Sequence, residues 1–135
     1  MELPSEVASV HAAEAWTGEV ARVCGLGEGD RDRLGLAVHE AVANAVLHGN
    51  RQEPGKRVRL AWERQDGRLT VTVGDEGAGF TPPRPTTELN LTPSGRGLLL
   101  IDHLTDGFRI VRRHDPPGTD VVLVLHLTEE RSRQP

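Results

Sequence analysis

The stretch DRDRLGLAVHEAVANAVLHG, residues 30–49, decides the fold, because its apolar residues repeat with the period of an α-helix. At ~100° per residue, measured from Glu40, six apolar residues fall between about 100° and 240°: Leu34, Val38, Ala41, Val42, Ala45 and Val46. Three polar residues lie at about 0°, 40° and 80°: Glu40, Asn44 and His48. The pattern predicts a helix that Asp30 caps and Gly49 ends, with a buried stripe and a polar, unburied edge.

The sequence around this helix predicts one more helix and a β-hairpin. Upstream, residues 5–24 have the composition of a helix, with Ser5 as its N-cap and Gly25 as its stop. Downstream, apolar and polar residues alternate over residues 58–63 and 69–73, which predicts two strands. Asp66-Gly67 between them is a hairpin turn signal.

The C-terminal half predicts a long loop, a short helix and a second hairpin. Residues 81–94 contain four prolines and almost no apolar pattern, which is typical of a functional or mobile loop. A short helix is expected at residues 97–105. Strands are expected at residues 108–112 and 120–127, joined by a turn at residues 116–118.

The order helix, helix, strand, strand, loop, helix, strand, strand predicts the α+β class. We expect a two-layer α/β sandwich in which helices cover one face of a mostly antiparallel sheet. The 135 residues suit a single domain, residues 1–135, with a polar tail at residues 129–135.

Composition excludes several classes of protein. A single Cys excludes a disulfide framework and a cysteine-rich zinc site. The longest apolar run, Leu98–Ile101, is far shorter than the ~20 residues of a membrane span, and no signal peptide is visible, so we expect a cytoplasmic protein without a membrane partner. The net charge of -4, without a long basic run, disfavours direct binding to nucleic acid.

Glycine is enriched, with 15 residues in 135 against a usual ~7%, and it clusters at two places. Gly74, Gly77 and Gly79 follow a predicted strand, and Gly95 and Gly97 open a predicted helix. Glycine lets the backbone approach a ligand closely, and a helix N-terminus attracts phosphate. The clusters predict a nucleotide site around the long loop, although ordinary turns would explain either cluster alone.

Glu40 and Asn44 lie one helical turn apart and suggest chemistry on the polar edge of their helix. A carboxylate can act as a general base, and an amide oxygen is a suitable ligand for Mg²⁺. A solvated polar stripe would explain the same two residues. The segment Gly49–Lys56 is not a P-loop, because its glycine spacing is one residue too long and Arg57 replaces Ser or Thr.

Four motifs, in this order, resemble the GHKL superfamily of ATPases and kinases. Glu40-Ala-Val-Ala-Asn44-Ala-Val-Leu-His48-Gly49 resembles its N box, and Asp75-Glu-Gly77-Ala-Gly79 its D-x-G-x-G box. Ser94-Gly95-Arg96-Gly97-Leu98 resembles the second glycine box, and Gly118-Thr119-Asp120 the final box. The His-Gly after the N box and the small size are most similar to anti-sigma factor serine/threonine kinases of the RsbW type.

The resemblance implies catalytic roles for three residues. Glu40 would be the general base, and Asn44 would coordinate Mg²⁺. Residues 80–96 would form the lid over ATP, from which Arg96 would reach the γ-phosphate. The expected fold is the Bergerat-type sandwich.

The resemblance also implies which residues bind the nucleotide. Asp75 would accept a hydrogen bond from the adenine amino group, and Thr119 would lie near the adenine. Gly77 and Gly79 would let the backbone pass against the nucleotide. Three residues would offer backbone N–H groups to the phosphates: Gly95, Gly97 and Leu98.

The activity implied is an ATP- and Mg²⁺-dependent protein serine/threonine kinase that is also an anti-sigma factor. It would sequester a sigma factor in one state, and phosphorylate a Ser or Thr of an anti-anti-sigma (STAS-domain) protein in another. The alternative is a non-catalytic switch that binds ATP or ADP and changes its affinity for partners by closing its lid. A free-standing ATPase of the chaperone or gyrase type is less favoured, because those relatives need further domains.

The sequence departs from the family in two places. Such kinases begin with a strand before the first helix, but only three residues precede Pro4 and Ser5. We therefore expect that edge strand to be missing or very short, which leaves a homodimer open. The lid is also unusually rich in proline, at Pro82, Pro83, Pro85 and Pro93.

Overall fold

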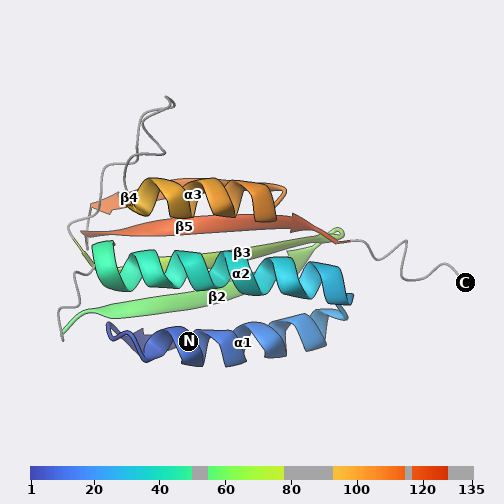
Figure 1. Cartoon of the computed structure of the whole chain (residues 1–135), viewed down its shortest axis with the longest axis horizontal. Helices are drawn as coiled ribbons and strands as arrows, with labels where there is room; N and C mark the ends of the chain where they lie inside the picture. The colour runs from blue at the N-terminus through green and yellow to red at the C-terminus, as the bar shows by residue number, and fades with distance from the viewer. Residues whose placement is uncertain (50–54, 78–92, 115–116, 128–135) are drawn as a thin grey trace, which may run out of the picture.

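The computed structural model describes residues 1–49, 55–77, 93–114 and 117–127, which form a two-layer sandwich (Figure 1). One layer is a five-stranded antiparallel sheet in the order β1-β2-β3-β5-β4. The strands are β1 (Glu2–Pro4), β2 (Arg57–Gln65), β3 (Arg68–Asp75), β4 (Gly107–His114) and β5 (Pro117–His126). The other layer contains α1 (Ser9–Cys24), α2 (Glu28–Asn44) and α3 (Pro93–Leu104), with a short π-helical segment, η1 (Ala45–Gly49), after α2. Helices cover one face of the sheet, which confirms the predicted α+β sandwich.

The chain starts with an edge strand of three residues, which agrees with the expectation that this strand is missing or very short. Strand β1 pairs antiparallel with β2, and the N-terminal amine of Met1 donates to the carbonyl oxygen of Leu60 at 2.9 Å. The first helix therefore starts at Ser9, and the expected cap at Ser5 is wrong. The backbone N–H of Ser5 instead bonds the carbonyl of Lys56 at 3.1 Å. Three residues are too few to show the alternation by which strands are recognised.

Helix α2 has the predicted buried face but a different start. It begins at Glu28, so Asp30 lies within the first turn and pairs with Arg33, at 2.7 Å between Oδ1 and Nη2, instead of capping the helix. Helical structure continues through η1 to Gly49, the predicted end. All six apolar residues of the predicted stripe are buried: Leu34, Val38, Ala41, Val42, Ala45 and Val46.

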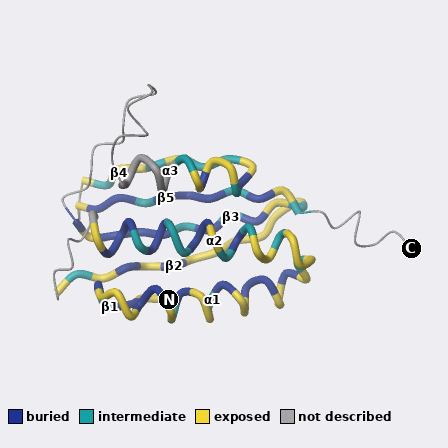
Figure 2. Tube along the Cα trace, viewed as in Figure 1, coloured by how far each residue is buried: buried dark blue, intermediate teal, exposed yellow. Residues whose placement is uncertain are grey.

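The core lies between the helices and the inner face of the sheet and is aliphatic. In Figure 2 strand β5, which lies between β3 and the edge strand β4, is coloured as buried over most of its length. The largest buried side chains of the sheet are Val58, Leu60, Leu69, Val71, Val73, Leu123 and Leu125. The first hairpin turns at Asp66 and Gly67 with φ of 52° and 73°, which is the left-handed pair that a type I′ turn requires and that the sequence predicted. Among the described residues, no helix is long and apolar enough to cross a membrane.

The C-terminal half differs from prediction at its element boundaries. Helix α3 starts at Pro93, so its first residues fall inside the range 80–96 expected for the lid. Pro117 and Gly118 belong to β5 and not to the preceding turn. The rest of the expected lid and the tail at residues 129–135 lie outside the described residues.

Candidate functional site

The ends of four elements meet at one end of the sandwich. Figure 1 shows that α2 and β3 end, and that α3 and β5 begin, at the same side of the molecule. Helix α2 packs beside α3, and η1 packs against β3. Because Asn44 ends α2, Asp75 ends β3 and Thr119 lies near the start of β5, the structure brings these separated motifs together.

Asp75 is a carboxylate held inside the protein. It is only 3% exposed, and its Oδ1 accepts a hydrogen bond from the backbone N–H of Gly77 at 3.0 Å. Burial raises the pKa of Asp75, and the N–H groups of Gly77 and Thr119 oppose that rise by bonding the ionised form. A buried acceptor of this kind discriminates strongly for a ligand that presents a donor to it.

Thr119 lies directly opposite Asp75 in the β3–β5 ladder and is 1% exposed. Its Oγ1 is buried and has no hydrogen-bond partner among the described residues. A buried hydroxyl without a partner costs about 1–3 kcal/mol. The cost is removed if a ligand or a bound water bonds to it, so the carboxylate and the hydroxyl together are suited to a polar ligand.

The orphaned hydroxyl predicts that Thr119→Val leaves the free energy of unfolding of the ligand-free protein unchanged or raises it by about 1 kcal/mol. Thr17→Val is the matched control: Thr17 is 2% exposed, and its Oγ1 donates to the carbonyl of Ala13 at 2.7 Å. That change should lower the free energy of unfolding by about 1 kcal/mol. Urea denaturation measures both values. An equal loss in the two variants would show that Thr119 Oγ1 is already bonded.

Asn44 and Glu40 occupy the C-terminal part of α2, where the helix meets this cluster. Asn44 is 7% exposed, so the prediction that it lies on an unburied edge is wrong. Glu40, one turn earlier, is half-buried and keeps access to solvent. The π-helical segment that follows Asn44 widens the helix, a distortion that is frequent at functional sites. Amide and carboxylate oxygens are hard donors that fit Mg²⁺.

The N-terminal end of α3 contains the second glycine motif. Gly95 lies in the first turn, where backbone N–H groups lack intrahelical partners and favour anions. Gly97 and Leu98 lie in the second turn, where an α-helix uses its N–H groups internally. Gly95 is therefore the best placed of the three for a phosphate, and the roles of the other two stay predictions. Gly79 lies outside the described residues.

Arg113 belongs to this region, although the sequence did not indicate it. Its Nη2 donates to the backbone carbonyl oxygen of Asp75, and its Nε lies 3.3 Å from Oδ1 of Asp120. The alternation of β4 makes an arginine there look like an ordinary exposed residue. The sequence signal that could have indicated Arg113 is Gly118, its partner in the β4–β5 ladder, because a glycine there leaves room for a large side chain.

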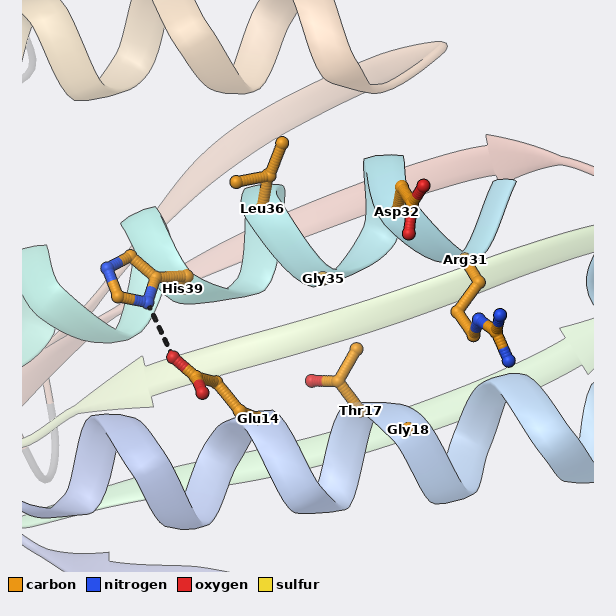
Figure 3. A pocket seen from close by; sticks show the side chains of 8 residues that line it. All are labelled: Glu14, Thr17, Gly18, Arg31, Asp32, Gly35, Leu36 and His39. Atoms are coloured by element: carbon orange, nitrogen blue, oxygen red, sulfur yellow. Dashed lines mark hydrogen bonds and ion pairs between the residues drawn. The ribbon is translucent and has the colours of Figure 1, made fainter. Parts of the chain in front are cut away.

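A separate groove of about 520 Å³ lies between α1 and α2, on the outside of the helix layer (Figure 3). Its lining residues are Glu14, Thr17, Gly18, Arg31, Asp32, Gly35, Leu36 and His39. A side-chain hydrogen bond crosses it, at 3.2 Å between Nδ1 of His39 and Oε1 of Glu14. None of the residues predicted to bind nucleotide is among them.

The fold and the clustered motifs together define a GHKL-type sandwich. A family model described as the histidine kinase-like ATPase domain matches residues 3–125. The chain belongs to this family.

Two similar proteins and one similar solved structure are consistent with that assignment. The chain is 33% identical over 101 residues to a protein of Geobacillus kaustophilus named anti-sigma F factor, covering 70% of this chain and 68% of that one. A protein of the same name from Oceanobacillus iheyensis is 29% identical over 101 residues, with the same coverage. The crystal structure of the RsbU and RsbW domains of a Mycobacterium tuberculosis protein superposes with a TM-score of 0.66 at 22% identity. The match covers 94% of this chain and 32% of the chain in that structure. Because the identity is only 22%, this likeness shows the fold alone.

Proposed function

We propose that this protein is an ATP- and Mg²⁺-dependent serine/threonine kinase that acts in the cytoplasm as an anti-sigma factor. The observation that carries the proposal is the buried pair of Asp75 carboxylate and orphaned Thr119 hydroxyl, at the end of the sandwich where α2 ends and α3 begins. The relatives named anti-sigma F factor support the choice of partners. These would be a sigma factor and an anti-anti-sigma (STAS-domain) protein.

The nucleotide would lie with its base at Asp75 and its phosphates toward the start of α3. The ionised carboxylate would accept a hydrogen bond from the adenine amino group, and Thr119 would complete the base pocket directly or through a water molecule. The N–H groups of the first turn of α3 would face the phosphates, and Arg96, which lies in that same turn, would be a further cation. Mg²⁺, when bound by Asn44 and the phosphates, would neutralise phosphate charge and align the groups that react.

The transfer step forms one bond and breaks one. The hydroxyl oxygen of the partner's Ser or Thr attacks the γ-phosphorus, the bond to the bridging oxygen breaks, and ADP leaves. Glu40 accepts the hydroxyl proton, because its half-buried carboxylate lies one helical turn before Asn44. Most of the rate acceleration would come from positioning and from stabilisation of charge.

Calorimetry with ATP, joined to a transfer assay with radiolabelled ATP, tests the proposal. The assay partner is a STAS-domain protein encoded beside this chain or captured with it from its native cell. We expect saturable binding that needs Mg²⁺, and label on a Ser or Thr of the partner. Binding without transfer would favour the non-catalytic switch, and absence of binding would overturn both functions.

The pKa of Asp75 predicts how nucleotide affinity depends on pH. Burial raises that pKa above its ordinary value, the nearby Asp120 raises it further, and Lys56 lowers it. The ionised carboxylate is the stronger acceptor of a hydrogen bond from the adenine amino group, so affinity should fall as the pH drops through the pKa of Asp75, which lies above the usual ~3.9. The effect of Asp75 on the free energy of unfolding has the opposite pH dependence. Because the raised pKa means that the protonated form favours the folded state, this stabilisation is present at low pH and is lost as the pH rises through the folded-state pKa. Fluorescent-nucleotide titrations between about pH 8 and 5 measure the trend, and Asp75→Asn should remove it. An identical pH profile in that variant would exclude Asp75 as the titrating group.

A further inference from the structure

Arg113 reaches Asp75 from the face of the sheet that the helices leave uncovered. Asp75 and Thr119 are paired and buried on the helix side, and the neighbouring pair, Arg113 and Gly118, points to the opposite face. From there the guanidinium donates to the carbonyl oxygen of Asp75. Asp75 therefore has its carboxylate in the candidate base pocket, and its backbone carbonyl accepts a hydrogen bond from Arg113 on the uncovered face of the sheet.

Two glycines make room for this contact. A Cβ at Gly118 would collide with the guanidinium, 2.7 Å from its Cζ, and with the carbonyl oxygen of Asp75. A Cβ at Gly74 would lie 2.5 Å from Oδ1 of Asp120, the carboxylate that flanks the same guanidinium. A side chain at either position would displace the guanidinium of Arg113 or the carboxylate of Asp120. The glycines of β3 and β5 therefore leave the space that Arg113 occupies.

The guanidinium of Arg113 is partly buried, so its interactions are stronger than those of an arginine on the open surface. The side chains of Arg113 and Asp120 are only 20% and 25% exposed. Burial raises the pKa of Asp120, and the charge of Arg59 opposes that rise. Bonds from a charged donor in such partly desolvated surroundings are stronger than those of solvated pairs.

The position of Asp75 in the chain explains why its carbonyl needs to be held. It is the last residue of β3, and the chain then turns so that the N–H of Gly77 bonds the same carboxylate. Fixing the carbonyl fixes the peptide plane that follows Asp75. That plane orients both the side chain and the turn at Gly77.

We propose that Arg113 is a positioning residue for adenine recognition. It holds Asp75 so that the carboxylate meets the exocyclic amino group, and it thereby contributes to the preference for an adenine base. The inference rests on the proposed binding of ATP but not on kinase activity. A residue on the uncovered face of the sheet would then contribute to the selectivity for the base.

The test compares ATP with purine riboside triphosphate, which lacks the amino group that Asp75 would bind. The measured quantity is the ratio of the two dissociation constants, in wild type and in Arg113→Gln. We expect Arg113→Gln to reduce the preference for ATP by about three- to tenfold, because a misplaced carboxylate no longer distinguishes the two bases. A purely structural role would weaken both nucleotides equally and leave the ratio unchanged.

Two further variants keep the result interpretable. Arg109→Gln is the matched control, because Arg109 is exposed and lies on the same strand and the same face; it should retain the wild-type ratio. Arg113→Lys keeps the charge but has a single donating nitrogen in place of the guanidinium that also pairs with Asp120, and it should give an intermediate ratio even if the Gln variant does not fold.

The outcomes separate this inference from the proposed function. If wild type prefers ATP and the Arg113 variants keep the full preference, the positioning role is overturned and the nucleotide site stands. If wild type binds neither triphosphate or does not distinguish them, the proposed base pocket fails, and this inference fails with it.

Discussion

Replacing Glu40 with alanine should leave ATP affinity nearly unchanged and reduce phosphoryl transfer by about 10²–10⁴-fold. Glu40 is half-buried on α2, one turn before Asn44, so its carboxylate lies beside the expected metal ligand and still meets solvent. A general base acts on the hydroxyl of the protein substrate and not on the nucleotide. Its removal should therefore lower the rate of the chemical step without changing nucleotide binding.

Single-turnover transfer from radiolabelled ATP to the cognate partner measures this effect, and calorimetry measures affinity. Glu28→Ala is the matched control, because Glu28 is an exposed glutamate at the other end of the same helix. It removes the same charge far from the site and should retain transfer. Transfer that survives Glu40→Ala at the wild-type rate would refute the assignment of the base.

Asp75→Asn should weaken ATP binding by about 10- to 100-fold, because a hydrogen bond to a charged acceptor is replaced by one to a neutral amide. Asp75 is 3% exposed, so bulk water has little access with which to replace the lost interaction. The same change removes a buried group that ionises unfavourably, so the ligand-free variant should be at least as stable as wild type at neutral pH. Reduced affinity with retained stability is the signature of a binding residue.

Calorimetry gives the affinities, and thermal unfolding without ligand gives the stabilities. Asp66→Asn serves as the control, because Asp66 is an exposed aspartate in the turn at the opposite end of β3, where asparagine suits the positive φ. It should change neither quantity appreciably. Wild-type affinity in Asp75→Asn would rule out this carboxylate as the adenine acceptor.

Strong local signals made much of the fold predictable. The apolar stripe on α2 and η1 repeats over about three turns, so its buried face could be predicted before any packing was known. The turn at Asp66 and Gly67 needs two positive φ angles, which few residue pairs tolerate. The glycine and aspartate motifs mark element ends, and the ends of α2, β3, β5 and α3 meet at one side of the sandwich.

The features that escaped prediction depend on contacts between distant parts of the chain. The sequence left open whether the edge strand is missing or very short, because three residues have no period and β1 is recognisable only by its pairing with β2. The burial of Asn44 arises from neighbouring elements that a helical wheel does not contain. The contact of Arg113 with the carbonyl of Asp75 joins positions 38 residues apart, and no spacing rule links them.

The most direct test of a nucleotide site at this end of the sandwich is an amide chemical-shift titration of the isotope-labelled protein with ATP and Mg²⁺. The account predicts saturable shifts at Gly77, Thr119 and the first turn of α3, with much smaller ones along the groove between α1 and α2. Shifts confined to that groove, around Gly18 and Gly35, or no shifts at millimolar ATP, would contradict it.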